Sequence, residues 1–335
     1  MSETYTLKDL ARMLRMSPST VSKALNDYPT ISDMTRQRVR ELADRLNYSP
    51  DPAAVSFKRK KSFTLGVIIP NLTDHFYAIA VGGIEEYAMQ QGYKCMVCQH
   101  FEDLERERDF CRMLERNKVD GLIVSISRST TDISHFRHLE ERGIPVVYFV
   151  RRPGAEETFY VTSNVYQGTI DAVGYLAGKG HQRIGHILGP PGLIATADRL
   201  NGYMDGLQRC GLPWDGALTA NSDLSEAGTI QAMEQLTSLP DPPTAIITFK
   251  DYVALDAMLH LKKTKATSTP PIEFIGFGNL PMLRYLDNPP LASLEEQCAA
   301  IGRRSAELLM SRITAGNNVM IPEAVLFDCE LKVLK

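Results

Sequence analysis

The stretch from residue 17 to residue 26, SPSTVSKALN, places small hydroxyls and one cation on a single short helix. Ser17 is a good N-cap residue, and Pro18 suits the first helical position, where its missing N–H costs nothing. The apolar residues make a narrow inward stripe: Val21, Ala24 and Leu25. The polar residues remain outside: Ser19, Thr20, Ser22 and Lys23. Small hydroxyls can donate to phosphates, and a lysine can reach a phosphate or a guanine edge, so this face suits DNA.

Residues that could do covalent or metal chemistry do not fall into a reactive pattern. The chain contains no GxSxG, GxxxxGK[ST] or HExxH sequence. His135 and His138 form an HxxH in a charged helix with no third ligand nearby, which favours a solvated face. Cys95 and Cys98 form a CxxC, but on a strand a separation of three puts them on opposite faces. We therefore expect no catalytic residue, no metal and no cofactor.

Two further helices are needed to position the hydroxyl-bearing one. Apolar residues recur at helical spacing from 7 to 14, with Thr6 as the cap, and a two-residue turn leads into the stretch above. A third helix is predicted from about 32 to 46, with four arginines around its apolar face. This arrangement predicts a helix-turn-helix, whose second helix lies in the major groove. The alternative is a generic three-helix bundle with a solvated polar face.

Charge is distributed unevenly along the chain. The 335 residues carry a net charge of −3, but residues 1–61 hold 12 Lys/Arg and 7 Asp/Glu, and the remainder holds 25 and 33. The first part is therefore +5 and the rest −8, which suggests a nucleic-acid-facing end joined to an ordinary body. No apolar run approaches the roughly 20 residues of a membrane span, and the N-terminus has no secretory signal. We expect a cytoplasmic protein with reduced cysteines and no membrane partner.

After residue 62 the sequence alternates between short apolar runs and helical segments. TLGVIIP, YKCMVCQ, DGLIVSIS and IPVVYFV read as strands, and RIGHILGP, TAIITFKD and EFIGFG repeat the order in the second half. Such βα alternation predicts parallel sheets covered on both faces. Two similar α/β lobes with a cleft between them would result. In such lobes ligands sit off the C-terminal ends of the strands, here including 70–77, 125–127 and 248–251.

The segments TLKDLARMLRMSPSTVSKALN and ISDMTRQRVRELADRLNYSP resemble the DNA-binding headpiece of the lactose-repressor (LacI/GalR) family of bacterial transcription regulators. The resemblance implies an all-α helix-turn-helix headpiece and an effector region of two doubly wound, periplasmic-binding-protein-like lobes. It implies base reading near Pro18, Ser19 and Lys23. By position, phosphates would be held by Thr6, Ser17, Thr20, Ser22, Asn26, Thr35 and Tyr48.

The resemblance also implies a hinge between the headpiece and the lobes. Residues 52–58 could form a short helix that is stable only against a partner. Ala54 and Phe57 would contact DNA there, with Phe57 at the position of the leucine that wedges into the minor groove. This chain departs from the family pattern at Asp51, Val55 and Pro18. Pro18 offers no side-chain hydrogen bond, so base reading would fall mostly on Ser19 and Lys23.

We expect the chain to divide into a headpiece at 1–48, a hinge at 49–61 and an effector-binding and dimerisation domain at 62–335. Lobe one is expected to comprise about 62–161 and 293–322, and lobe two about 162–292 and 323–335. The final segment, VLFDCELKVL, is expected to end as a strand in the second lobe. No leucine heptads follow it, so a homodimer on a pseudo-palindromic operator is the simpler expectation.

The effector site is predicted by position and by strand ends. His75, Phe76 and Tyr77 resemble the family's aromatic entry to the cleft, and Arg199 matches an arginine that holds effector oxygens. Positions that clamp sugar hydroxyls in relatives are here Val150, Lys250 and Gly278, while Glu296 replaces a glutamine. Other candidates are Ser125, Ser127, Asp251 and Asn279.

The cations among these residues suggest an anionic effector, because arginine and lysine prefer carboxylate or phosphate. Lys250, Arg199 and Arg151 carry that hypothesis. The alternative is that an acid such as Asp251 or Glu296 neutralises Lys250, which then never meets the ligand.

The function expected is that of a sequence-specific transcription regulator, a repressor whose operator affinity is set by a small metabolite such as a sugar or sugar derivative. The metabolite could act as an inducer or as a co-repressor, since both would use the same cleft. The alternatives are a solute-binding receptor, which would need export, and an α/β enzyme, which would need a reactive pair in the cleft. Neither alternative explains the basic residues 1–61.

Overall fold

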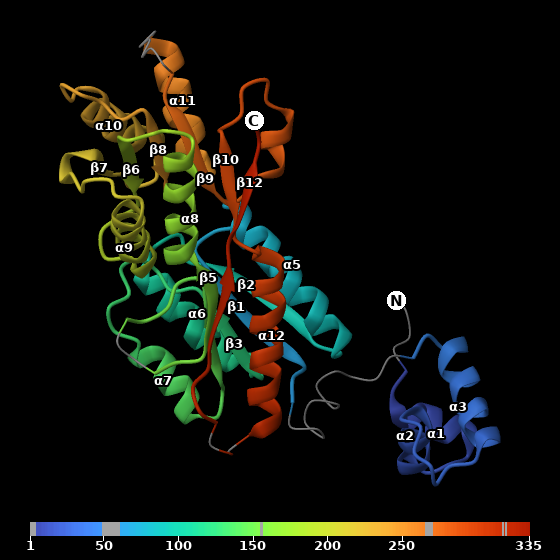
Figure 1. Ribbon diagram of the computed structural model, residues 1–335. Coiled ribbons are helices and arrows are strands. Elements are labelled where there is room, and N and C mark those ends of the chain that lie inside the picture. Colours follow the sequence, from blue (N-terminus) through green and yellow to red (C-terminus); the bar gives the residue numbers. More distant parts are fainter. Residues whose placement is uncertain (1–4, 49–60, 155–156, 265–270, 317, 319) are drawn as a thin grey trace. The chain divides into compact units, whose positions relative to one another are not determined.

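The computed structural model describes residues 5–48, 61–154, 157–264, 271–316, 318 and 320–335 (Figure 1). It divides into two compact units, Met1–Phe63 and Thr64–Lys335, and each is described by itself below. No helix among the described residues is long and apolar enough to cross a membrane.

The first unit is a helix-turn-helix followed by a third helix. The helices are α1 (Leu7–Leu14), α2 (Pro18–Leu25) and α3 (Asp33–Arg45). Thr6, Ser17 and Ser32 cap them with side-chain oxygens, and Arg15 ends α1 in the left-handed conformation. The helices enclose a small core: Leu10, Ala11, Leu14, Val21, Ala24, Val39, Leu42 and Ala43. The three predicted helices are confirmed, because their caps and apolar stripes are local in sequence.

The first lobe of the second unit is built on a six-stranded parallel sheet of order β11-β5-β4-β3-β1-β2. The strands are β1 (Thr64–Ile69), β2 (Lys94–Gln99), β3 (Gly121–Val124), β4 (Val146–Phe149), β5 (Tyr160–Asn164) and β11 (Ala324–Asp328). The helices of this lobe are α5 (His75–Gln90), α6 (Leu104–Arg116), α7 (Ser134–Glu141) and α12 (Cys298–Ala315).

The second lobe repeats this plan with strand order β12-β10-β9-β8-β6-β7, in which only β12 runs antiparallel to its neighbour among the described strands. The strands are β6 (Ile184–Leu188), β7 (Thr219–Asn221), β8 (Ala245–Thr248), β9 (Glu273–Phe277), β10 (Ala292–Glu295) and β12 (Glu330–Val333). The helices are α8 (Val165–Gly178), α9 (Ile194–Arg209), α10 (Glu226–Thr237) and α11 (Asp251–Thr264), with short 3₁₀ turns η1 (Gly216–Leu218) and η2 (Pro281–Tyr285). The predicted fold class of a helical headpiece and two doubly wound lobes is confirmed.

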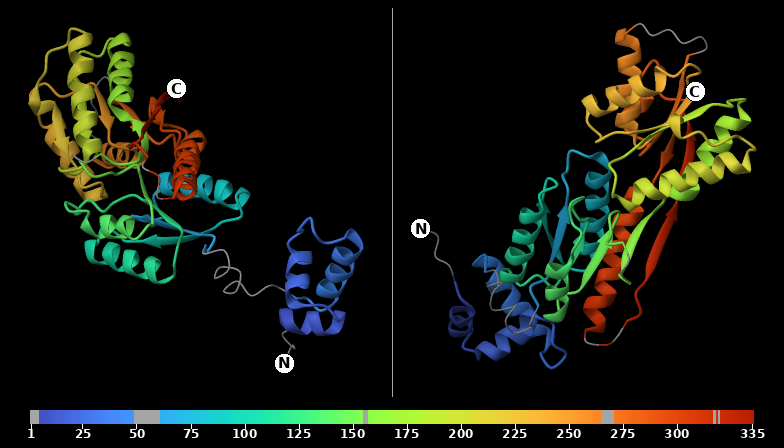
Figure 2. Two further views of the ribbon diagram at one scale, coloured as in Figure 1. Left: turned by 90° about the horizontal axis from the view of Figure 1, so that it is seen from below. Right: turned by 90° about the vertical axis from the view of Figure 1, so that its left-hand side faces the viewer.

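The chain passes between the lobes after β5, after β10 and between β11 and β12. The red strands in Figures 1 and 2 show the last of these passages. This path corrects the expected lobe boundaries at three places. Residues 162–164 belong to β5 of the first sheet, although they were expected in the second lobe. Residues 324–328 pair with β5 in the first sheet, although the whole final segment was expected in the second lobe. Residues 293–295 pair with β9 in the second sheet, although they were expected in the first lobe. An apolar strand sequence does not reveal which sheet it joins, because pairing is non-local.

Helices α5 and α12 approach closely through two glycines. A Cβ on Gly302 of α12 would lie 1.9 Å from the Ala80 carbonyl oxygen, and one on Gly83 of α5 would lie 2.3 Å from the Ala299 carbonyl oxygen. Only glycine permits such a contact between backbones. The contact fixes the start of α5 relative to the start of α12, which places His75–Tyr77 and the segment before Cys298 in one region.

Candidate functional site

The exposed face of α2 carries the predicted base-reading residues. Pro18, Ser19 and Lys23 are exposed, and Val21 and Ala24 are buried against the other helices. Lys23 forms no ion pair with any described residue. An uncompensated cation on a face of small side chains can approach a duplex without steric conflict or desolvation of a partner.

Several hydroxyls that were predicted to hold phosphates also cap helices. Ser17 Oγ accepts from the Thr20 N–H at 3.0 Å, and the two hydroxyls are 2.8 Å apart. Because one hydroxyl of the pair donates to the other, one O–H stays free for a phosphate. Ser32 and Thr35 repeat this arrangement at 2.9 Å. Ser22 contributes its carbonyl oxygen to the Asn26 side-chain amide at 2.7 Å.

Thr6 differs from the other capping residues. Its hydroxyl donates to Asp9 Oδ2 at 2.6 Å, and its backbone N–H donates to the same oxygen at 3.0 Å. Since the hydroxyl proton is already used, Thr6 can offer a phosphate a hydrogen bond only if it turns away from Asp9. Tyr48 is half-buried and packs against the core of this unit. Two predicted DNA-binding residues, Ala54 and Phe57, lie outside the described residues.

A cavity of about 940 Å³ lies between the two lobes of the second unit. Seven of the predicted effector residues line it: Phe76, Tyr77, Ser127, Arg199, Lys250, Asp251 and Glu296. Ser127, Lys250 and Glu296 follow the C-terminal ends of β3, β8 and β10, and the other four lie in the first two turns of α5, α9 and α11, which agrees with the strand-end rule. Three predicted residues do not line the cavity: His75, Ser125 and Asn279.

The three predicted residues that do not line the cavity lie close to it in the chain or contact residues near it. The buried Ser125 hydroxyl lies 3.0 Å from the Tyr77 hydroxyl, so it supports a residue that does line the cavity. Asn279 donates from its side chain to Glu295 at 3.0 Å and from its backbone to Ser293 at 2.9 Å. His75 has a buried Nε2 without a hydrogen-bond partner among the described residues.

Each cation behind the anionic-effector hypothesis is paired with a carboxylate. Lys250 Nζ lies 3.3 Å from Asp74 Oδ2, which joins the second lobe to the first. One Arg151 nitrogen donates to both oxygens of Glu102, at 2.7 and 2.9 Å. The Lys250 partner is thus neither Asp251 nor Glu296, the two acids named from the sequence. A cation with a carboxylate at this distance presents little net charge to a ligand.

Arg199 is the most deeply buried of these cations. Its guanidinium lies 4.2 Å from the centre of the Phe249 ring and 4.3 Å from that of Phe277. Its Nη2 donates to Glu296 Oε1 at 3.4 Å. Burial lowers the pKa of Arg199 and raises the pKa of Glu296, and the attraction between the two opposes both shifts. The Arg199 guanidinium and the Glu296 carboxylate together offer hydrogen-bond donors and acceptors to ligand hydroxyls.

Asp251 lines the cavity and also connects two segments of the second lobe. Its carboxylate is buried and accepts from the Ser293 hydroxyl at 2.7 Å and from the Leu280 N–H at 2.9 Å. Burial raises the pKa of Asp251 to about 7, although these two hydrogen bonds lower it. The residue therefore joins the start of α11 to the segment after β9.

Sequence reasoning missed several cavity residues. Asp74 and Glu102 provide the carboxylates, and Phe249, Tyr252 and Phe277 provide aromatic faces. All five lie at or just beyond a strand end or at the start of the following helix. The strand-end rule was therefore the signal that could have found them, applied to every side chain rather than to those that match relatives.

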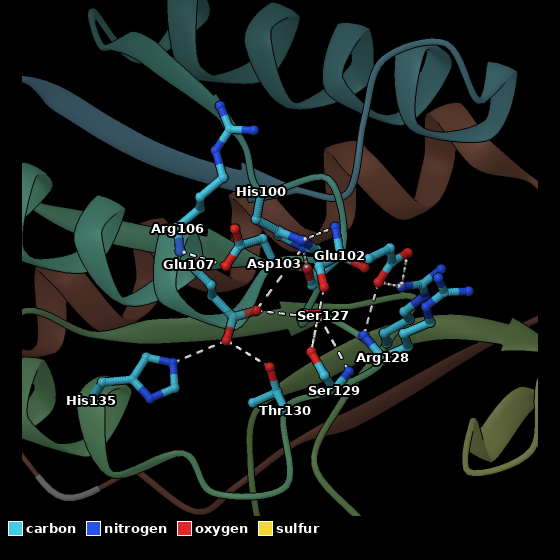
Figure 3. Close-up of polar contacts among 12 residues, drawn as sticks. His100, Glu102, Asp103, Arg106, Glu107, Ser127, Arg128, Ser129, Thr130 and His135 are labelled. Atoms are coloured by element: carbon cyan, nitrogen blue, oxygen red, sulfur yellow. Dashed lines mark hydrogen bonds and ion pairs between the residues drawn. The ribbon is translucent and has the colours of Figure 1, made fainter.

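The prediction that His135 lies on a solvated face is wrong. His135 Nε2 lies 3.0 Å from Glu107 Oε1, and the Glu107 side chain has no exposed surface (Figure 3). His138 is exposed, as predicted. Among the described residues no group of three or more His, Cys, Asp or Glu side chains is arranged to hold a metal ion.

Comparisons with known proteins cover both units. Residues 6–51 match the model of bacterial regulatory proteins of the lacI family, and residues 62–331 match the model of periplasmic binding proteins and the sugar-binding domain of the LacI family. The chain is 34% identical over 328 residues to the HTH-type transcriptional repressor CytR of Escherichia coli (strain K12), covering 97% of this chain and 94% of that one.

Two solved structures share more than a quarter of their residues with this chain. A putative ribose operon repressor from Burkholderia thailandensis is 27% identical, with a TM-score of 0.72 over 82% of this chain and 100% of the other. A periplasmic binding protein/LacI transcriptional regulator from Alkaliphilus metalliredigens, complexed with D-xylulofuranose, is 27% identical, with a TM-score of 0.67 over 80% and 96%.

Proposed function

The chain belongs to the LacI family of bacterial regulatory proteins, and from that premise we propose that it binds a pseudo-palindromic operator as a homodimer and responds to a neutral pentose or pentose derivative. It is a DNA-binding transcription regulator and not an enzyme, since the relatives that cover nearly all of it are transcriptional repressors. The proposed division is a headpiece at 1–48, a hinge at 49–61 and an effector domain from 62.

The DNA-binding role of individual residues is supported by the face of α2. Ser19 and Lys23 would read base edges, and the free hydroxyl of the Ser17–Thr20 pair would hold a phosphate. Two such helices in successive major grooves require a dimer, which is why a pseudo-palindrome is proposed. The partner is double-stranded DNA.

The single observation that carries the effector class is the pairing of three cavity cations with carboxylates. Lys250, Arg151 and Arg199 each face a carboxylate, so a neutral ligand with several hydroxyls can bridge donor and acceptor pairs without leaving a buried charge unpaired. Aromatic side chains such as Phe76, Phe249 and Tyr252 offer apolar faces for the ring. An anionic ligand bound at any of these three cations would have to displace its carboxylate first.

The names of two relatives narrow this class. One is described as a ribose operon repressor, and the other was solved with D-xylulofuranose. Both compounds are neutral five-carbon sugars. We therefore replace the anionic effector suggested by the sequence with a neutral pentose, free or carrying a further neutral group.

Calorimetry on the full-length chain tests this proposal. D-Ribose, D-xylulose and D-ribose 5-phosphate are titrated into the same preparation. We expect at least one neutral sugar to bind and the phosphate to bind at least tenfold more weakly, because Lys250, Arg151 and Arg199 are already paired. Tighter binding of the phosphate would contradict the proposal and restore the anionic effector.

The assembly and the DNA contacts need separate tests. Analytical ultracentrifugation of the full-length chain is expected to give a dimer, and a monomer at micromolar concentration would contradict that part. In gel-shift assays on random genomic fragments, wild-type protein should retain selected sequences. Lys23→Gln should lower affinity and selectivity together, whereas the exposed Lys262→Gln on α11 should change neither.

A further inference from the structure

A buried carboxylate lies directly behind one wall of the effector cavity. Glu107 of α6 has no exposed surface and accepts three hydrogen bonds (Figure 3). Its Oε2 accepts from the Ser127 N–H at 2.6 Å, and its Oε1 accepts from the Thr130 hydroxyl at 2.7 Å and from His135 Nε2 at 3.0 Å. Glu107 does not line the cavity itself, but Ser127 and Thr130 do.

A second carboxylate holds the same segment from the same side. Glu102 Oε2 accepts from the Arg128 N–H at 2.9 Å, and its two oxygens accept from Arg151. The segment from Ser127 to Thr130, which we term the cavity wall, is therefore fixed by side chains from the β2–α6 region and not by strand pairing. Removal of the Glu107 carboxylate would leave the buried Ser127 N–H and the half-buried Thr130 hydroxyl unpaired.

The protonation states in this cluster follow from the contacts. Burial raises the pKa of Glu107, but the hydrogen bonds from His135, Ser127 and Thr130 outweigh burial and leave the pKa below its ordinary value. Glu107 is therefore an acceptor, and His135 Nε2 must carry the proton. His135 Nδ1 is buried and has no hydrogen-bond partner among the described residues, so nothing there competes for the proton.

His100 lies between the Glu102 backbone and the Glu107 carboxylate, with Nε2 4.0 Å from Glu107 Oε2, and is neutral. Its Nδ1 accepts from the Glu102 N–H at 3.1 Å, so its proton lies on Nε2, which donates to the Ser125 carbonyl at 3.1 Å. Burial lowers the pKa of His100, although the Ser125 hydrogen bond and Glu107 raise it. A protonated ring would place an N–H against the Glu102 N–H, so the contact itself also opposes protonation.

Packing of the first lobe does not by itself require the buried polar cluster around Glu107. A buried carboxylate costs several kcal/mol of desolvation, and apolar side chains of similar volume often replace buried polar groups without loss of stability. What an apolar side chain cannot do is hold a backbone N–H and a hydroxyl of one short loop at fixed positions. Two of the three donors of Glu107, the Ser127 N–H and the Thr130 hydroxyl, belong to residues that line the cavity.

We propose that Glu107 is a positioning residue for effector recognition, which fixes the cavity wall through the Ser127 N–H and the Thr130 hydroxyl and is itself oriented by His135. This inference rests on the proposed function of the cavity as an effector site. It predicts that loss of the carboxylate loosens the wall in the free protein and weakens effector binding without affecting operator binding in the absence of effector.

Amide hydrogen exchange of the full-length chain, resolved to single residues by mass spectrometry, tests the first part. Glu107→Gln is expected to raise the exchange rate of the Ser127 amide at least tenfold, because a neutral amide with one acceptor oxygen cannot satisfy the same donors. Glu105→Gln on the same helix is the control, since that side chain is 69% exposed and contacts Arg108. Unchanged exchange at Ser127 in Glu107→Gln would overturn the proposal.

Calorimetry with D-ribose and D-xylulose tests the second part. Thr130→Val is the variant to use if Glu107→Gln does not fold, because it removes one hydroxyl and keeps the shape. Both variants are expected to bind the sugar at least fivefold more weakly than wild type, with unchanged affinity for the operator in the absence of sugar. Faster exchange at Ser127 with unchanged sugar affinity would overturn the role in recognition.

The two proposals fail in different ways. If neither sugar binds the wild-type protein, the proposed effector class is wrong, and the exchange rates of Ser127 still decide whether Glu107 fixes the wall. If a sugar binds the wild type and Glu107→Gln equally well, the effector class stands and Glu107 is a structural residue of the first lobe only.

Discussion

At the scale of single residues, Asp251 connects the cavity to the stability of the second unit. The folded protein holds this carboxyl with a pKa of about 7, whereas an unfolded chain releases the proton near the ordinary value of 3.8. Between these two values the folded state binds more protons than the unfolded state. The contribution of Asp251 to stability is therefore present at low pH and is lost as the pH rises toward 7.

The prediction concerns the difference in the free energy of unfolding between wild type and Asp251→Asn. As the pH rises from 5 to 7, the free energy of unfolding of wild type should fall relative to the variant, by at most about 1.4 kcal/mol per pH unit. Urea denaturation at a series of pH values measures this difference, and contributions from groups that do not interact with Asp251 cancel. A difference that is constant across the range, or that increases with pH, would show that the burial of Asp251 does not raise its pKa.

The pairing of Lys250 with Asp74 is a residue-level feature that the sequence could not supply. The two residues are 176 positions apart, and their pairing depends on how the two lobes meet. The sequence identified Lys250 as unusual and left open that an acid neutralises it, which is the outcome. Asp74 is one of the further acids that it left open, and Asp251, although adjacent in the chain, is turned toward Ser293 and Leu280.

We predict a coupling between Lys250 and Asp74 of about 0.5–1 kcal/mol, since both side chains are about one quarter exposed. The variants Asp74→Asn, Lys250→Met and the double variant form a double-mutant cycle, measured by urea denaturation. Asp74 Oδ1 also caps α5, and asparagine preserves that acceptor. A coupling near zero would mean that the ion pair does not hold the lobes together in solution.

At the scale of elements, the sequence predicts the features that depend on residues close together in the chain. It does not predict the features that depend on contacts between distant segments. The bounds of α1 and α2 follow from Thr6, Ser17 and Pro18, all of which act within one turn of the helix. The division of the last segment at Cys329 into strands of two different sheets could not be predicted, because its apolar alternation fits either sheet. His135 was misread because its partner, Glu107, lies on another helix.

The cap of α2 gives a prediction that separates folding from DNA binding. Ser17→Ala should destabilise the first unit by about 1 kcal/mol, because the Thr20 N–H loses its acceptor. Ser17→Asp should keep the cap but lower operator affinity, because it adds a negative charge beside the phosphates. Amide exchange at Thr20 and operator titrations on the full chain measure the two effects. Equal operator affinity for Ser17→Asp and wild type would place Ser17 away from the DNA.

The contact between α5 and α12 gives a second prediction at this scale. Gly302→Ala should destabilise the second unit by several kcal/mol, since its Cβ would lie 1.9 Å from the Ala80 carbonyl oxygen and the helices would have to separate. Gly82→Ala on α5 is the matched control. A Cβ there meets nothing within 4 Å, so alanine should stabilise the helix by about 0.5–1 kcal/mol.

Thermal denaturation of the two glycine variants tests whether α5 and α12 contact each other at Gly302. Similar melting temperatures for Gly302→Ala and Gly82→Ala would show that α12 does not lie against α5 as described. The different roles of Gly302 and Gly82 were not predictable from the sequence, because both glycines lie inside helical patterns. It depends on which face of each helix meets its neighbour.

At the scale of the whole molecule, the chain combines a cationic unit that can hold a duplex with an anionic, two-lobed unit that encloses a cavity. The charges of +5 for residues 1–61 and −8 for the rest follow from the sequence, as does the two-lobed fold. The near neutrality of the cavity does not, since it depends on pairs such as Arg151–Glu102 and Arg199–Glu296. Function therefore follows from the sequence more readily than effector chemistry does.

Regulation by a metabolite requires that binding in the cavity change the affinity of the protein for operator DNA. Operator titrations of the full-length chain, followed by fluorescence anisotropy of a labelled site selected in vitro, measure this directly in the presence and absence of D-ribose or D-xylulose. We predict that the neutral sugar bound in calorimetry changes operator affinity at least fivefold, which is the lower end of typical allosteric coupling. Equal operator affinity with the cavity empty and with it saturated would contradict the account.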